Sequence, residues 1–318
     1  MKRLSLLSAA LLLLTLPLPA RSGKLIRVPQ RMKSIQLAID YAEDGDTILV
    51  SEGVYNESIT LRDGIVLIGI SSEKTVIRGQ RGKPVVTGAQ NSVLRHFTVE
   101  NGSIGIICEN VFMTIEHCVV RNNKESGIQC IIALPIIRNN IIFRNSWSGI
   151  FCESARSHKG LIQNNLVAEN GYSGLMLNGQ SEVLSENNIF YFNKDFGIFV
   201  SEGSRRSRII YNNFFGNRSP GNQNAKIDNT NLYQDPAFMI SEPDAHDFWG
   251  IEPRSLRGKG KEGKNIGLVK RVFYIPHDDN IEVVSPDEKK TPQKPGDSEE
   301  TGPVEVNMES EVEDGERK

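Results

Sequence analysis

The feature that most constrains the fold is a short phrase that recurs at a nearly constant interval. Gly followed by Ile or Leu begins at intervals of 22, 22, 25 and 23 residues, at Gly105, Gly127, Gly149, Gly174 and Gly197. Two asparagine columns share this period: Asn139-Asn140, Asn164-Asn165, Asn187-Asn188 and Asn212-Asn213, and Asn101, Asn122, Asn145, Asn170, Asn193 and Asn217. Self-similarity at this interval marks a solenoid, whose repeats bury their apolar faces only against one another.

The composition of each repeat indicates strands. Between the Asn and Gly residues lie short β-branched runs, which suit strands and tight turns, and the Leu-x-x-Leu-x-Leu framework of leucine-rich repeats is missing. A coil of about 23 residues with three strands and three bends predicts an all-β fold, a right-handed parallel β-helix solenoid.

Three cysteines occupy one column of this repeat. The period-two alternation of a strand turns Ile128 and Cys130 inward, and Cys108 and Cys152 take the same place in the neighbouring coils. We expect small, buried, hydrophobic thiols in a stack. One strained disulfide, or less readily a soft-metal site, is an alternative reading. Their redox state stays open.

Other columns predict turns and a further apolar surface. We expect Asn140, Asn165, Asn188 and Asn213 to lie at tight turns and to bond to one another between coils, with Cys118 in the preceding place. Two adjacent apolar columns cannot both face inward, and the sequence leaves their phase open: Val119, Ile141, Leu166, Ile189 and Phe214, and Val120, Ile142, Val167, Phe190 and Phe215.

The two ends of the chain differ from the middle. Residues 1–23 have a basic start and an apolar run too short to cross a bilayer, which predicts a secretory signal peptide and an exported protein, periplasmic or extracellular. Residues 285–318 carry 11 acidic and 5 basic side chains and no aromatic residue, which predicts a disordered tail. Residues 24–284 would form one β-helix domain. The charge balance shows no nucleic-acid signature, and no later segment could span a membrane.

Both ends of an open β-helix need a cover, because their strand edges are unpaired. Residues 34–42 place apolar side chains at helical spacing behind Ser34, a candidate N-cap, and predict a helix across the first coil. At the other end, residues 235–238, 247–249 and 267–275 lose the repeat and are expected to fold over the last coil.

Over about residues 35–268 the sequence resembles the pectin-lyase-like right-handed β-helix superfamily. Ile35-Gln36, Gly53-Val54-Tyr55 and Glu57 look like the opening of many exported bacterial members. The Asn and Gly-Ile columns are similar to the short parallel β-helix repeat proteins, which include carbohydrate-active proteins and the periplasmic accessory protein for the copper site of nitrous oxide reductase. The resemblance implies the fold and leaves the chemistry open.

The catalytic signatures of that superfamily are incomplete in this chain. No Gly-His-Gly turn is found, Asn229-Thr230-Asn231 has an amide where a carboxylate is needed, and Arg218-Ser-Pro220 continues to Gln223 instead of a second Arg. The five His residues, at 96, 117, 158, 246 and 277, are scattered and give a copper site no support. No metal and no cofactor are expected, and whether the protein is an enzyme stays open.

The outward strand face carries the candidate site. If Cys130 points inward, its neighbours form an outward stripe with two aromatics and a Met, beside a column rich in Glu and Asn. Sugar rings stack on aromatics, and amides and carboxylates bond to hydroxyls. The predicted substrate-binding residues are Gln129, Phe151, Glu153, Met176, Asn178 and Phe199, and Glu153 and Asp195 are the carboxylates to test if the face is catalytic.

Two functions remain open on the sequence. The first is binding, and conceivably modification by a lyase or hydrolase activity, of an extracellular or envelope polysaccharide. The second is a non-catalytic surface or assembly protein that uses the same face to contact a protein partner. The stripe could also be covered by another segment of the chain. Whether the stripe is exposed or covered discriminates between them.

Overall fold

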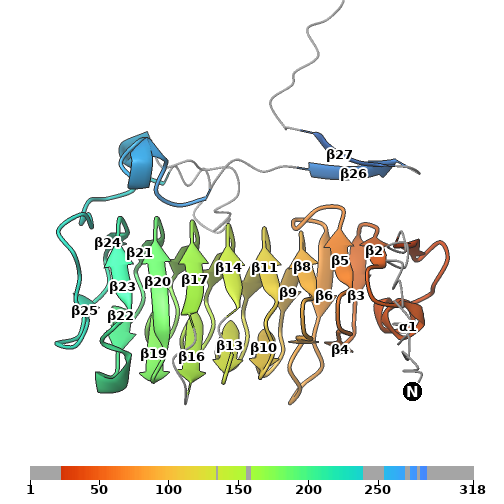
Figure 1. Ribbon diagram of the computed structural model, residues 1–318, viewed down its shortest axis with the longest axis horizontal. Helices are drawn as coiled ribbons and strands as arrows, with labels where there is room; N and C mark the ends of the chain where they lie inside the picture. Colours follow the sequence, from red (N-terminus) through yellow and green to blue (C-terminus); the bar gives the residue numbers. More distant parts are fainter. Residues whose placement is uncertain are drawn as a thin grey trace, which may run out of the picture.

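The computed structural model describes residues 23–133, 135–154, 159–238, 254–268, 273–277 and 280–284. The predicted signal peptide up to residue 22 and the predicted tail 285–318 lie outside the described residues, as do 247–249. Figure 1 shows an elongated solenoid whose coils succeed one another along the long axis in sequence order. The described residues contain no helix that is both long and apolar enough to cross a membrane.

Three parallel sheets, here called A, B and C, run the length of the solenoid, and each coil contributes one strand to each sheet (Figure 1). Sheet A contains β1 (Leu25–Val28), β2 (Thr47–Val50), β5 (Val66–Gly69), β8 (Val93–Arg95), β11 (Thr114–Glu116), β14 (Ile136–Arg138), β17 (Lys159–Gln163), β20 (Glu182–Glu186) and β23 (Arg208–Ile210). Sheet B contains β3 (Gly53–Tyr55), β6 (Thr75–Arg78), β9 (Thr98–Glu100), β12 (Val119–Arg121), β15 (Ile141–Phe143), β18 (Leu166–Ala168), β21 (Ile189–Tyr191) and β24 (Asn213–Phe215). Sheet C contains β4 (Ile59–Thr60), β7 (Val86–Thr87), β10 (Ile106–Glu109), β13 (Ile128–Ile131), β16 (Ile150–Ser154), β19 (Leu175–Gly179), β22 (Phe196–Val200) and β25 (Ser219–Gly221). This is the predicted right-handed parallel β-helix.

The remaining described elements are short. They are α1 (Ile35–Tyr41), the 3-10 helices η1 (Glu202–Ser204), η2 (Arg254–Leu256) and η3 (Lys261–Gly263), and an antiparallel hairpin of β26 (Phe273–His277) and β27 (Asn280–Val284). Helix α1 lies at the N-terminal end of the solenoid, as predicted (Figure 1). Ser34 caps it by accepting a hydrogen bond from the Leu37 amide at 3.3 Å. Glu57 accepts two more from the amides of Ile35 and Gln36, at 3.1 and 3.0 Å.

The repeated Gly-Ile phrase places one residue where no side chain fits and the next in the core. A Cβ on Gly149 would lie 2.5 Å from Val167 Cγ1 and 2.8 Å from the carbonyl oxygen of Gly174 in the next coil. Ile128 and Ile150 follow the glycines, pair in register and are fully buried. The close approach of neighbouring coils therefore requires the glycine, and the stacking of one aliphatic shape on the next requires the residue after it.

The asparagines form hydrogen-bonded ladders at the bend between sheets A and B. Asn165 Oδ1 accepts from the amide and the Nδ2 of Asn140, at 2.9 and 3.1 Å, and Asn165 Nδ2 donates to Asn188 Oδ1 at 2.9 Å. Cys118 takes the preceding place, as predicted, and its amide donates to Asn140 Oδ1 at 2.9 Å. The ladder continues through Asn212 to Asn231, so the assignment of Asn213 was wrong by one residue. The left-handed residues are the preceding ones, Asn139, Asn164 and Asn187.

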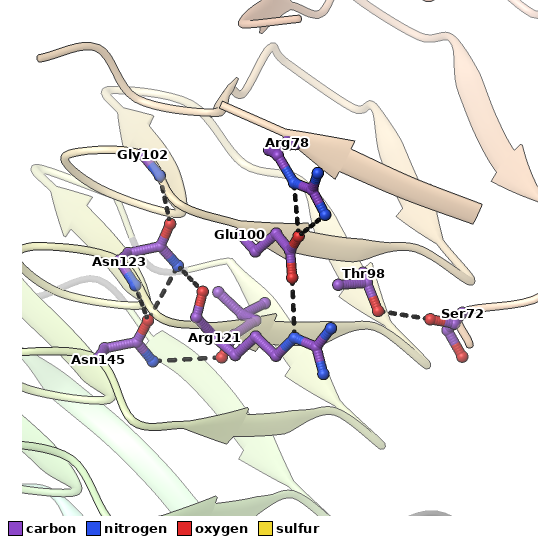
Figure 2. Close-up of polar contacts among 9 residues, drawn as sticks. Ser72, Arg78, Thr98, Glu100, Gly102, Arg121, Asn123 and Asn145 are labelled. Carbon is purple, nitrogen blue, oxygen red and sulfur yellow. Dashed lines mark hydrogen bonds and ion pairs between the residues drawn. The ribbon is translucent and has the colours of Figure 1, made fainter. Parts of the chain in front are cut away.

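A second ladder lies at the bend after sheet B, where Figure 2 shows its first rungs. Asn123 donates from Nδ2 to Asn145 Oδ1 at 2.9 Å, and Gly102 donates from its amide to Asn123 Oδ1 at 3.0 Å. It continues through Asn170 and Asn193 to Asn217. Asn101 and Asn122 do not belong to it, because both have positive φ in the turn position before the ladder. The continuous row of side-chain amide hydrogen bonds gives partners to buried polar groups that would otherwise have none.

The outer surface of the first coils carries buried carboxylates held between arginines. Glu100 is 4% exposed and accepts from Arg78 Nε at 2.9 Å and from Arg121 Nε at 3.0 Å (Figure 2). Glu116 is placed in the same way between Arg95 and Arg138. Because each carboxylate has two cationic partners, its burial is compensated by charge-assisted hydrogen bonds.

Packing decides the phase that the sequence left open on sheet B. Val120, Ile142, Val167 and Phe190 face the core, and Phe214, not Phe215, continues their column. The other column, Val119, Ile141, Leu166 and Ile189, faces outward and is nevertheless buried, together with Leu256 and Ile266.

The C-terminal segment, residues 254–268, covers that outer face. Gly267 accepts from Asn164 Nδ2 at 2.8 Å, and Lys261 Nζ lies 3.1 Å from Glu186 Oε2. The segment therefore runs back along the side of the solenoid, over sheet B, and the prediction that residue 267 and its successors fold over the last coil was wrong for the part described. The physical reason is that Leu256 and Ile266 bury their side chains against the apolar outward column of sheet B.

Candidate functional site

The outer face of sheet C presents the predicted stripe as one column. The strand register pairs Ile107, Gln129, Phe151, Met176 and Phe199 one after another. Neighbouring members lie one strand spacing apart, about 4.8 Å. All are half-buried except Phe151, which is only 4% exposed.

A second column runs beside the stripe, two residues nearer the bend toward sheet A. It contains Glu109, Ile131, Glu153 and Asn178 in register, and Ser201 follows in the next coil. Glu109 and Glu153 are exposed. The predicted contact residues Gln129, Glu153, Met176 and Asn178 therefore share one continuous surface.

A third column, on the other side of the stripe, was missed by the sequence argument. Tyr172 donates its amide to the Trp147 carbonyl oxygen at 2.9 Å, and Trp147 donates to that of Glu125 at 3.1 Å. Asp195 donates to the Tyr172 carbonyl at 2.9 Å, so the order is Glu125, Trp147, Tyr172 and Asp195. Each of these residues stands two positions before a repeat glycine, and that spacing was the available signal.

Trp147 and Tyr172 complete an aromatic cluster with the stripe. The Trp147 ring centroid lies 5.0 Å from that of Phe151 and 6.4 Å from that of Tyr172, with which it is stacked. Farther along, Phe196 and Phe199 lie 5.8 Å apart. We call Trp147, Phe151, Tyr172, Met176 and Phe199 the aromatic face. Because Trp147 lies against the buried Phe151, the surface offered to a ligand belongs to Trp147 and Tyr172 more than to Phe151.

The two carboxylates considered for catalysis lie apart. Asp195 is two coils beyond Glu153, about 10 Å along the axis, and at the opposite end of the strand. Paired glycosidic carboxyl groups lie within about 9.5 Å of each other. Asp195 also forms an ion pair with Arg218, 3.3 Å from Nη1 to Oδ1. This arrangement does not assemble Glu153 and Asp195 into an acid and base pair.

The thiols behind this face are stacked inside the solenoid. Cys108, Cys130 and Cys152 pair in register, are buried and carry no disulfide. Hydrogen bonding between Cys130 and the Cys108 and Cys152 thiols, which favours the protonated form, followed by burial, raises the pKa of Cys130 well above its usual range. The predicted aliphatic role therefore fits the structure.

Comparison with known proteins places the chain. Residues 39–240 match the family model described as "Periplasmic copper-binding protein (NosD)", which is more than half of the sequence. The chain belongs to the NosD family. The family description names a periplasmic protein, which agrees with the export expected of this chain. No match was found among curated proteins.

Solved structures similar to this NosD-family chain include two whose names describe enzymes that act on polysaccharides. An alginate lyase from Paenibacillus sp. is 17% identical, with a TM-score of 0.49, and the match covers 61% of this chain and 77% of that one. The A-module of the mannuronan C-5 epimerase AlgE4 from Azotobacter vinelandii is 18% identical, with a TM-score of 0.42, over 64% of this chain and 71% of that one.

The copper in the NosD description can be tested against the donor atoms. Soft thiolates suit Cu(I), but a thiol must lose its proton to bind. Cys108, Cys130 and Cys152 face the core, and the raised pKa of Cys130 favours its protonated form. Among the described residues no group of three or more His, Cys, Asp or Glu side chains could hold a metal. The residues that the structure describes therefore do not fit a copper site.

Proposed function

We propose that this NosD-family protein binds a polysaccharide on the aromatic face of sheet C, in the periplasm. The observation that carries the proposal is the stacked pair Trp147 and Tyr172, half-buried, beside Met176 and Phe199. Flat rings with a polar rim suit the apolar faces of sugar rings. The in-register columns extend over several successive coils, so an extended polymer lying along the axis would contact side chains from each of them.

Polar groups at the edge of the aromatic face support the same proposal. Glu153 is exposed, and Asn178 lies next to it in the column. Gln129 Oε1 accepts no hydrogen bond within the described part of the chain. Sugar hydroxyls are donors as well as acceptors, so a rotation of the Gln129 amide would supply this oxygen with a partner.

The described part of the C-terminal segment does not cover the aromatic face. Residues 254–268 pack on sheet B, through Leu256 and Ile266, instead of on sheet C. The half-burial of the aromatic face arises at least in part from its own ring contacts. A protein partner on this face is the alternative, and a glycan panel separates the two.

The test is affinity electrophoresis in gels that contain neutral, amine-bearing or uronate polysaccharides. Wild type should be retarded by at least one of them, and Trp147→Ala and Tyr172→Ala should each weaken binding about tenfold, a loss of about 1.4 kcal/mol. The matched control is Tyr233→Ala, an aromatic that is 58% exposed and stacks on Phe214 at the end of the solenoid. Equal retardation of all variants, or none with any polysaccharide, would reject the proposal.

A further inference from the structure

The charges around the aromatic face are unevenly distributed, and this inference rests on the proposed function. Trp147 and Tyr172 stand between two carboxylates in their own column, Glu125 before them and Asp195 after them. Glu125 is exposed, and Asp195 is partly neutralised by Arg218. Within the described part of the chain, one end of the ring pair therefore meets a negative charge that forms no ion pair.

The column on the other side of the stripe adds further negative charge. Glu109 and Glu153 lie two coils apart with Ile131 between them, and both are exposed. In the described part of the chain, Glu109, Glu125 and Glu153 form no ion pair. A glycan lying along the aromatic face would have carboxylates within one or two strand spacings on both of its sides, close to the Debye length of about 10 Å at 0.1 M salt.

Among the residues that the structure describes, the cations near the face are fewer than the carboxylates and less well placed. Arg218 is 79% exposed and is paired with Asp195. Lys124 and Lys194 precede Glu125 and Asp195 by one residue and occupy the neighbouring backbone column, next to Ser146 and Gly171 rather than next to the rings. A polyuronate needs cations along its path, because each of its sugars carries a carboxylate. This face would repel such a chain.

We infer that the aromatic face selects polysaccharides without acidic sugars and favours those that bear amines. The rings supply stacking that any sugar can use, and Glu109, Glu125 and Glu153 decide the charge that is tolerated. An amine-bearing hexosamine would form ion pairs with these carboxylates, whereas a neutral sugar would donate hydrogen bonds from its hydroxyl groups to them without a charge pair. Glu125 and Glu153 are thus specificity-determining residues.

The experiment compares three hexasaccharides by calorimetry at slightly acidic pH and low salt: chitosan hexamer, its fully N-acetylated counterpart, and a galacturonate hexamer. Wild type should bind the uronate at least tenfold more weakly than the N-acetylated hexamer, and the chitosan hexamer most tightly. Glu125→Gln with Glu153→Gln should narrow the gap between uronate and neutral hexamers about tenfold, and salt should narrow it in wild type. The net-charge control is Glu52→Gln with Glu262→Gln, both at distant exposed sites, and it should leave the ranking unchanged.

The outcomes separate the two proposals. Binding of the uronate as tightly as the neutral hexamer would overturn the selectivity and leave the glycan site standing. The selectivity would also be overturned if neither the Glu125 and Glu153 substitutions nor added salt changed the difference in affinity between the uronate and the neutral hexamer. If none of the three hexamers binds and no polysaccharide retards the protein, the proposed function itself falls, and the selectivity falls with it.

Discussion

At the scale of single residues, asparagine holds the solenoid together because its amide can satisfy two coils at once. Asn165 Oδ1 accepts two hydrogen bonds from Asn140, and its Nδ2 donates to Ile137 and Asn188. No other side chain of this size has both a donor with two hydrogens and an acceptor with two lone pairs. The ladder therefore keeps a row of polar groups in the core at little cost.

Removing one asparagine of the ladder should lower the free energy of unfolding. Asn165→Ala leaves the amide and Nδ2 of Asn140 without their acceptor in a fully buried place, so we expect a loss of about 3 kcal/mol in the free energy of unfolding. Chemical denaturation measures it. The control, Asn178→Ala on the outer face of sheet C, should change stability by less than about 0.5 kcal/mol. Similar losses in the two variants would show that the ladder is not stabilising.

The thiol that replaces asparagine at the start of the ladder predicts a pH dependence. Burial, as the largest cause, raises the pKa of Cys118 from 9.0 to about 12. The unfolded chain then releases this proton at a lower pH than the folded chain, so the stabilisation is complete below pH 9 and is lost as the pH rises toward 12. The free energy of unfolding should fall by about 1.4 kcal/mol from this thiol between pH 8 and pH 10.

The comparison variant for this effect is Cys118→Ala. It removes one buried thiol and should therefore show a smaller decrease in stability between pH 8 and pH 10 than wild type does. Cys130, whose pKa is also raised, stays in both proteins and contributes equally. Identical decreases in wild type and variant would refute the assignment to Cys118.

At the scale of elements, each face of the solenoid is used differently. The outward column of sheet B is apolar and is covered by residues 254–268, whereas the outward face of sheet C gathers Trp147, Tyr172 and their neighbours. Both arrangements fit one rule: a contiguous apolar patch on a protein surface is either covered by another segment or used for binding. Residues 254–268 thereby stabilise one face, and this described part of the C-terminal segment does not cover the other.

The attachment of this segment can be tested with Ile266→Ser. Ile266 is 1% exposed, and replacing it by a polar side chain should cost about 2–4 kcal/mol of its contact with sheet B. Trypsin should then cut at Lys259 or Lys264 at least tenfold faster, while glycan retardation stays unchanged. Leu37→Ser, at a residue that is 53% exposed, is the control. Cleavage at the wild-type rate would mean that Ile266 does not hold the segment.

At the scale of the whole molecule, the sequence determined the solenoid and most of its interior. The period of the glycines and asparagines requires one coil to repeat over the next, and the two-residue period of a strand turns Cys108, Cys130 and Cys152 inward. It also placed Gln129, Phe151 and Met176 in one outward column. These features depend on local geometry, which the order of residues encodes directly.

Only the tertiary structure decided the remaining features. The Asn212-Asn213 pair is displaced by one residue in the sequence, because Tyr211 takes the left-handed position that Asn187 has in the preceding coil, while the strand pairing stays regular. A displacement of one residue exchanges the two faces of a strand, so Phe214 and not Phe215 faces the core. Trp147 and Tyr172 lie in bends before the strands of sheet C, where no period-two pattern predicts which way a side chain points. The destination of residues 254–268 depended on the apolar outward column of sheet B, which forms only when the coils are packed and is not a property of any one segment.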